Sequence, residues 1–489
     1  MNRILITLAC GVTVVAYAAN WPTPLIGYFL SMTGLILIMA VKKNPIGTFS
    51  WIWWPWVLAL APSMTGLLTY THPAISLDAL LYIFFYVSAA SVGYIVTFYS
   101  SPHPIKASDS HCMEVVDSIL YYRNIISYMA ILGILGAVFF AIEMILIVRA
   151  NVGDLFILRD QFSSREVGAL SRLAPLLVWC SWVALAAAII GWEMISPIRR
   201  VLWLTSAFSA TFLSILSAGR QTVFQILIIV ALCFLYRLPL RKIYKNANPF
   251  GFYRRVKKLG LFARFFATVS VVGGVFYMGL VAVFRQDQTN SLSKSEYLFY
   301  VFRVEPQQEV YKILSSIPYD IGDAIYEAII YFSSGISLFS GFLTIQYEGF
   351  YGGTFTFPWL ARRFEILTDT SVVEAMQRLQ VMMESGRFMS HGWATAFASY
   401  VLDFGHIGAF LFMFLVGILS AMTWRMYAKR PDIFSLMLIF AANINLFYMI
   451  MVPATSDSIF FFFVIGNVLL HLLLPLRRTS AVQMQEQKS

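Results

Sequence analysis

The sequence predicts an all-α polytopic membrane protein with about 12 transmembrane helices and one large external helical loop. Three observations lead to this fold class. Of the 489 residues, 59% are hydrophobic and only 12% are charged, with a mean hydropathy of +0.72, whereas soluble domains carry about 25% charged residues. The apolar residues occur in runs long enough to cross a bilayer as helices. The alternating apolar and polar pattern of transmembrane barrel strands is absent from the sequence.

The individual spans follow from length, because a hydrocarbon core of about 30 Å needs roughly 20 apolar residues per helix. Scanning at that length predicts spans centred on residues 4–20, 24–41, 51–69, 78–98, 125–148, 172–192, 201–218, 221–238, 261–284, 406–427, 433–451 and 458–476. Arg3, the apolar run after it and Ala16-Tyr17-Ala18 are also typical of a cleavable signal peptide. We expect the first helix to be retained, because an uncleaved helix fits the orientation that the charges predict.

The basic residues predict the orientation, because Lys and Arg concentrate on cytoplasmic loops near helix ends. The cytoplasmic loop at residues 237–260 is the strongest marker, since residues 237–258 hold eight Lys or Arg and no Asp or Glu. With this loop inside, both termini are predicted to be cytoplasmic. A basic run between two spans more often contacts acidic lipid headgroups than nucleic acid. The net charge of +10 therefore predicts orientation and contact with membrane lipids, and no nucleic-acid partner.

Three regions follow: residues 1–284 with nine spans, an external (periplasmic) loop at 285–404, and residues 405–489 with the last three spans and a cytoplasmic tail. The loop holds 13 of the chain's 25 carboxylates. Within it, Ser371-Val-Val-Glu374 is a capping-box pattern that predicts an amphipathic helix. Residues 324–343 are apolar, but Glu327, two glycines and four serines weaken them as a span. We expect them to form an external helix lying on or dipping into the outer leaflet.

The familiar motifs for metals, nucleotides and disulfides are missing from the sequence. The four cysteines and six histidines show no disulfide framework and no metal-ligand spacing. No P-loop, no glycine-rich dinucleotide fingerprint and no Asp-x-Asp pair occurs. We therefore expect no cofactor and no metal, and we disfavour ATP-driven transport and metal-dependent use of nucleotide sugars.

One arginine stands between two apolar runs, in the segment LSAGRQTVFQI at residues 216–226. Arg220 follows Gly219, which permits close approach of a ligand to the backbone, and ionisable residues at this depth are functional hypotheses by default. A guanidinium suits bidentate recognition of phosphate. Arg220 therefore predicts a phosphate at the outer headgroup level. For Arg362, Arg363 and Arg378 we favour snorkelling or surface ion pairs instead.

Four short motifs carry a resemblance to a known family. They are Ser217-Ala-Gly-Arg220-Gln221, Phe284-Arg285, Gly352-Gly353-Thr354-Phe355 with Pro358, and Tyr400-Val-Leu-Asp403-Phe-Gly405-His-Ile-Gly408. With the twelve-span layout and the late external loop, the chain resembles over nearly its whole length the Wzy-type oligosaccharide repeat-unit polymerases, which make O-antigen and exopolysaccharide. It also resembles O-antigen ligases, in which a histidine precedes a Gly-x-x-Gly motif more closely than His391 precedes Gly405 here.

The resemblance implies a GT-C-like glycosyltransferase of the bacterial inner membrane, acting in polysaccharide biosynthesis such as that of lipopolysaccharide. It would join undecaprenyl-pyrophosphate-linked oligosaccharide repeat units at the outer face, without a metal, and release undecaprenyl pyrophosphate. A flippase and a chain-length regulator are its implied protein partners. Such a reaction needs positive charge on the leaving pyrophosphate and is helped by a base near the attacking hydroxyl.

These needs select the candidate site residues. For the leaving-group clamp we predict Arg220 and Arg285, followed by Arg303, with a second basic surface from Arg159, Arg165 and Arg172. Candidates for the base are Asp403, His391, Glu305, Glu348 and Asp287. Two of them have ordinary alternatives, because an acid such as Asp403 also caps helices and His391 lies beside the aromatic anchor Trp393.

Other functions stay open at this stage. An O-antigen ligase would use the same lipid-linked donor. A transporter of lipid-linked oligosaccharide predicts internal repeats and helices interrupted near the bilayer midplane, and a non-catalytic scaffold has no need of a buried arginine. Convergence of Arg220 and Arg285 on one outward cavity would favour pyrophosphate chemistry over the transporter and the scaffold.

Overall fold

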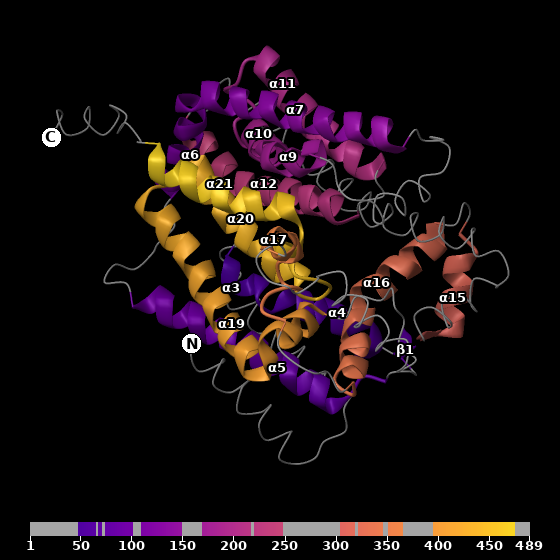
Figure 1. Cartoon of the computed structure of the whole chain (residues 1–489). Coiled ribbons are helices and arrows are strands. Elements are labelled where there is room, and N and C mark those ends of the chain that lie inside the picture. Colours follow the sequence, from indigo (N-terminus) through magenta and orange to yellow (C-terminus); the bar gives the residue numbers. More distant parts are fainter. Residues whose placement is uncertain are drawn as a thin grey trace.

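The computed structural model describes residues 47–64, 67–70, 74–100, 109–148, 169–216, 220–247, 304–317, 321–345, 351–364 and 395–474. This part of the chain is helical apart from one small sheet and the connecting turns (Figure 1). The all-α fold class is therefore confirmed for it. The predicted spans at 4–20, 24–41 and 261–284, and the predicted helix after Ser371, lie outside the described residues.

Apolar helices long enough to cross a bilayer make this a membrane-embedded protein. Among the described residues, four stretches qualify: α5 (Leu77–Tyr99), Arg123–Glu143 within α7 (Arg123–Val148), Leu173–Ile190, and α19 (Ala396–Lys429). Shorter apolar stretches lie in α12 (Arg220–Ala247), α16 (Ile321–Phe342), α20 (Ile433–Tyr448) and α21 (Ser458–Leu473). Large apolar side chains such as Phe208, 70% exposed, and Ile407, 79% exposed, face outwards, as lipid contact requires.

The helices pack in three groups. Helices α6 (Asp109–Tyr121), α7, α10 (Cys180–Ile190) and α11 (Pro197–Leu216) lie on one side, and α5 and α19 lie on the other (Figure 1). Between them run α12, α20 and α21, and α20 contacts α19 on one side and α6 and α10 on the other. Helix α6 was not predicted, because its polar residues made residues 109–121 resemble a loop.

Two predicted spans differ in detail from the structure. The first is the span at 172–192, which is confirmed as an apolar stretch long enough to cross a bilayer, Leu173–Ile190, but is not one continuous helix. It is divided at Trp179 into α9 (Ala169–Val178) and α10. Pro175 removes a backbone donor inside α9. The Trp179 indole N–H donates to the Leu176 carbonyl at 2.9 Å, and a continuous helix would use that carbonyl for a backbone hydrogen bond.

The second is the span predicted at 51–69, which becomes α3 (Thr48–Trp51) and α4 (Trp54–Met64), followed by strand β1 (Leu68–Tyr70). Strand β1 pairs antiparallel with β2 (Val304–Pro306), with Thr69 opposite Glu305. This small sheet, and α15 (Gln308–Ser315), which packs on α16, lie at one edge of the molecule (Figure 1).

The apolar stretch at 324–343 forms helix α16, but it does not lie on a surface along its whole length. From Ser333 onwards its four serines are 5% exposed or less, and the helix contacts α4 and α5. The Tyr70 and Ser333 hydroxyls are 2.5 Å apart, and Ser340 Oγ accepts the Ser76 amide at 3.0 Å. Small hydroxyl side chains with internal partners let this half enter the helical body. The predicted helix is confirmed, and its place relative to the outer leaflet stays a prediction.

Helix α19 carries the kink that shapes the candidate site. It starts at Ala396, ten residues before the predicted tenth span, and Gly405 inside it has φ 67° and ψ 176°. Positive φ favours glycine. The predicted boundary between the loop and the last spans, at 404/405, therefore coincides with a break in helical geometry inside one element.

Candidate functional site

Asp403 joins two of the sequence motifs. Its carboxylate accepts the Phe355 amide at 3.1 Å, and the amide and the hydroxyl of Thr356, both at 2.6 Å. The side chain of Asp403 is almost fully buried, at 1% exposure. The segment at 351–358 is therefore fixed on α19 by a carboxylate from the Tyr400–Gly408 motif.

The kink supplies the backbone part of this contact. Carbonyls just before a helix break lose their helical partners, and here the Leu402 and Asp403 carbonyls accept the Tyr351 and Gly352 amides, each at 3.2 Å. Gly352 and Gly353 have φ of 58° and 96°. The glycines of both motifs thus permit the turn and the break that bring the motifs together.

The same segment is tied to the turn between α20 and α21. This turn contains the short 3-10 helix η1 (Ala454–Ser456). Thr455 Oγ1 donates to the Thr356 carbonyl at 2.9 Å, and the Trp359 indole donates to the Thr455 carbonyl at 3.2 Å. Trp359 precedes the Arg362-Arg363 pair in the short helix α17 (Pro358–Phe364).

Asp457 connects this turn to the start of α12. One carboxylate oxygen caps α21 by accepting the Ile459 amide at 2.9 Å, and the other accepts the Thr222 hydroxyl at 3.5 Å. Tyr448, at the end of α20, donates to the Gln221 carbonyl at 2.7 Å. Arg220, the first residue of α12, therefore lies two positions from a residue that contacts Asp457.

We call this set of contacts the motif junction. It is made by residues 351–359, by Leu402 and Asp403 of α19, by Tyr448 and residues 454–457, and by Gln221 and Thr222 of α12. Three of the four motifs that carry the family resemblance take part in it. These motifs are far apart in the sequence, and the hydrogen bonds of the junction link them in one place.

Burial sets the electrostatics of Asp457, which lies in the turn before α21. Withdrawal from water raises the pKa of its carboxyl group from 3.8 to about 6, against the opposing effect of the hydrogen bonds from Ile459 and Thr222. The Gln225 side chain, fully buried on α12, and the Phe460 amide also lower this pKa as hydrogen-bond donors. The junction thus places a titratable acid among donors from α12 and α21.

The structure brings together some of the predicted site residues. Asp403 lies in the junction, and Arg220 begins the helix that enters it. Arg172 belongs to α9; the side chains of Arg172 and Arg220 lie outside what the structure describes. Glu305 is exposed on β2 and takes no part in the junction contacts given above. The remaining candidates lie outside the described residues: Arg159, Arg165, Arg285, Asp287, Arg303, Glu348 and His391.

Four residues of the junction were not predicted from the sequence: Asp457, Thr222, Thr356 and Thr455. Asp457 had a usable signal, because it is an acid in the short turn between the last two predicted spans. The threonines had none, since their partners lie far away along the chain. Within the described ranges, no group of three or more His, Cys, Asp or Glu side chains could hold a metal ion.

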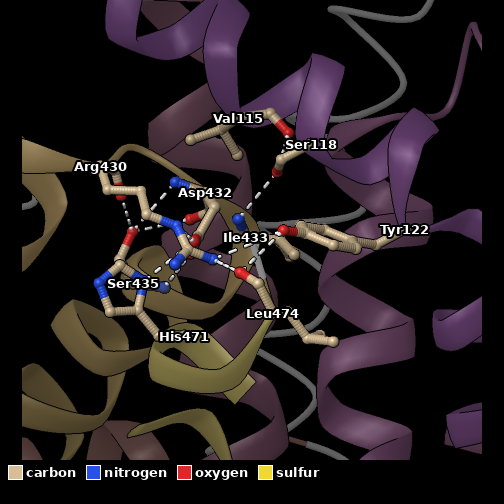
Figure 2. Close-up of polar contacts among 9 residues, drawn as sticks. All are labelled: Val115, Ser118, Tyr122, Arg430, Asp432, Ile433, Ser435, His471 and Leu474. Atoms are coloured by element: carbon tan, nitrogen blue, oxygen red, sulfur yellow. Dashed lines mark hydrogen bonds and ion pairs between the residues drawn. The ribbon is translucent and has the colours of Figure 1, made fainter. Parts of the chain in front are cut away.

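A second polar cluster lies at the other end of α20 (Figure 2). Asp432 caps α20 by accepting the Ser435 amide at 2.7 Å, and its other oxygen lies 2.9 Å from His471 Nδ1 and 3.0 Å from Arg430 Nε. Ser118 of α6 accepts the Ile433 amide at 3.0 Å. This cluster fastens α6, α20 and α21 to one another.

The two clusters mark the two ends of the helical body. The 16 residues of α20 correspond to about 24 Å at 1.5 Å per residue. Arg430 belongs to a loop that the charge pattern predicts to be cytoplasmic. In that predicted orientation, the motif junction lies towards the outer face.

Comparison with known proteins assigns the chain to no family. No family model, no curated protein and no solved structure matches the chain. The function therefore has to be inferred from the chemistry of the junction and from the sequence motifs that form it.

Proposed function

We propose that the protein is a repeat-unit polymerase, a metal-independent GT-C-like glycosyltransferase that joins undecaprenyl-pyrophosphate-linked oligosaccharides at the outer face of the bacterial inner membrane and releases undecaprenyl pyrophosphate. One observation supports this proposal most strongly. The segment before the kink of α19, the glycine turn at 352–353 and the start of α12 are linked by hydrogen bonds at one end of the helical body.

The start of α12 suits a leaving pyrophosphate. The first amides of a helix have no partner within the helix, and the helix dipole favours an anion there. Arg220 adds a permanent positive charge at this position, and Arg285 is the proposed second member of the clamp. Charge stabilisation of this kind acts on the pyrophosphate as the sugar bond breaks.

Asp403 has a positioning role in this proposal. Its oxygens already accept hydrogen bonds from three donors of the 351–358 segment, and it is buried. Such a carboxylate orients a loop and is poorly placed to take a proton from a substrate hydroxyl. The base is therefore another acid.

A transporter is the second candidate, because the kink at Gly405 interrupts a long apolar helix. The position of the kink argues against it. After Gly405 the helix continues for 24 residues, to Lys429, which is about 36 Å and exceeds a hydrocarbon core of about 30 Å. If the stretch after Gly405 crosses the bilayer, the kink falls at its boundary, whereas transporter sites lie near the midplane.

The arginines provide the test. We expect Arg220→Ala and Arg285→Ala each to abolish polymer in cells that lack another copy of the protein, while protein levels in the membrane stay normal. The matched control is Arg199→Ala, near the start of α11 on the predicted cytoplasmic side, which should still support polymer formation. Normal polymer from either of the first two variants would refute the proposed clamp.

A further inference from the structure

We propose that Asp457 is the base that takes the proton from the attacking sugar hydroxyl. The inference rests on the proposed function and names a residue for it that lies outside the motifs of the family resemblance. In this step the hydroxyl proton moves to the Asp457 carboxylate and the hydroxyl oxygen forms a bond to the anomeric carbon. The bond from that carbon to the pyrophosphate oxygen breaks, and its electron pair leaves with the pyrophosphate.

Asp457 lies close to the proposed clamp. It reaches the start of α12 through Thr222, two residues from Arg220. The clamp on the leaving group and the proposed proton acceptor therefore belong to one site. The other candidate acid in the junction, Asp403, is committed to the backbone of the 351–358 segment.

Asp457 is more accessible than Asp403. It is only partly buried, whereas Asp403 is almost fully buried. Its contact with Thr222 is long at 3.5 Å, so a substrate hydroxyl can replace the threonine there. A carboxyl group with a pKa of about 6 is also better matched to proton transfer near neutral pH than an ordinary aspartate.

Gln225 gives Asp457 a second contact with α12. It is fully buried, and its side chain lowers the pKa of Asp457 as a hydrogen-bond donor. Two residues of α12, Thr222 and Gln225, therefore hold Asp457 against the start of the helix that begins with Arg220.

Near pH 6, Asp457 is the group whose charge changes among the described side chains in this part of the site. Among the described side chains, Tyr448 of α20 is the titratable group that interacts with it, and Arg220 begins the helix that carries Thr222. Tyrosine and arginine ordinarily titrate at about pH 10 and above 12. A change in rate near pH 6 would therefore report on Asp457.

The test separates proton transfer from helix capping. Asp457 caps α21, and serine and asparagine cap helices as well as aspartate does but do not act as bases. We expect Asp457→Ser and Asp457→Asn to fold and to bind the lipid-linked donor with KM changed less than about threefold, while kcat falls about 10²- to 10⁴-fold. Asp457→Glu should recover part of the rate, and the wild-type rate should rise as the pH increases through about 6.

Asp78→Asn is the matched control, because Asp78 is an exposed acid in the first turn of α5, and it should keep the wild-type rate. Wild-type kcat in Asp457→Ser would refute the proposed base without refuting the proposed polymerase function. A raised KM with normal kcat would refute it too and assign Asp457 to binding. A wild-type protein that makes no polymer from competent substrate would instead refute the proposed function, and the role of Asp457 with it.

Discussion

At the scale of the residue, the junction depends on Asp403. Three donors from Phe355 and Thr356 converge on its carboxylate, which is withdrawn from water. Buried donors that lose their acceptor carry the full cost of their own desolvation. The stability of this region is therefore more sensitive to Asp403 than to an exposed acid.

We expect Asp403→Ala to lower the free energy of unfolding by about 2 to 4 kcal/mol, because it leaves buried donors of Phe355 and Thr356 unpaired. Polymer formation should be lost with it, since the 351–358 segment loses its anchor. Asp403→Asn, which keeps one acceptor oxygen, should be affected less. Denaturant unfolding in detergent measures the first effect, and equal stability of Asp403→Ala and the wild type would contradict the anchoring role.

Only some residues of the site could be predicted from the sequence. Arg220 and Asp403 were identified from their residue types and local setting, and both belong to the junction or to the element that enters it. Thr356 and Thr455 were not, because their hydrogen bond joins positions that are 99 residues apart. A single sequence carries no local signal for such a pair. The convergence of Arg220 with Arg285 stays a prediction, because Arg285 lies outside the described residues.

At the scale of the element, helices α5 and α19 approach so closely that glycine is required at the contact. A Cβ atom added at Gly93 would lie 2.2 Å from the Phe414 carbonyl oxygen, and one added at Gly417 would lie 2.0 Å from the Ala90 carbonyl oxygen. Small residues allow membrane helices to pack backbone against backbone. This contact places α19, and with it the kink, on the body of the protein.

Gly417→Leu should destabilise the protein by at least about 1 to 3 kcal/mol, the usual cost of overpacking a tight contact, because α5 cannot move away without losing its other neighbours. Leu419→Ala on the same helix is the control, since Leu419 is 60% exposed and should be tolerated. The thermal unfolding temperatures of the two variants in detergent measure the difference. A Gly417→Leu variant as stable as Leu419→Ala would show that the contact is not close.

Elements with long apolar runs were predictable, and those shaped by tertiary contacts were not. Helices α5, α7 and α20 follow the predicted spans to within a few residues, because length and hydropathy decide them. The pairing of β1 with β2 joins Leu68 to Pro306, which no local pattern records. The polar helix α6 is held by packing and had no apolar run to reveal it.

At the scale of the whole molecule, two polar clusters close the ends of the central helices. The Asp432 cluster is satisfied by Arg430, His471 and Ser435 (Figure 2), which suits a structural fastening. The junction differs, because it is formed by motifs of the family resemblance. In the predicted orientation it lies at the outer face, where the proposed function needs its site.

The most direct measurement is polymerisation by the purified protein with undecaprenyl-pyrophosphate-linked repeat units, in the presence of a chelator and without nucleotide. The account predicts a ladder of longer lipid-linked glycans that disappears with Arg220→Ala and persists with Arg199→Ala. Flux of the same lipid across a sealed bilayer, in place of a ladder, would favour the transporter. No ladder from competent substrate would contradict the account.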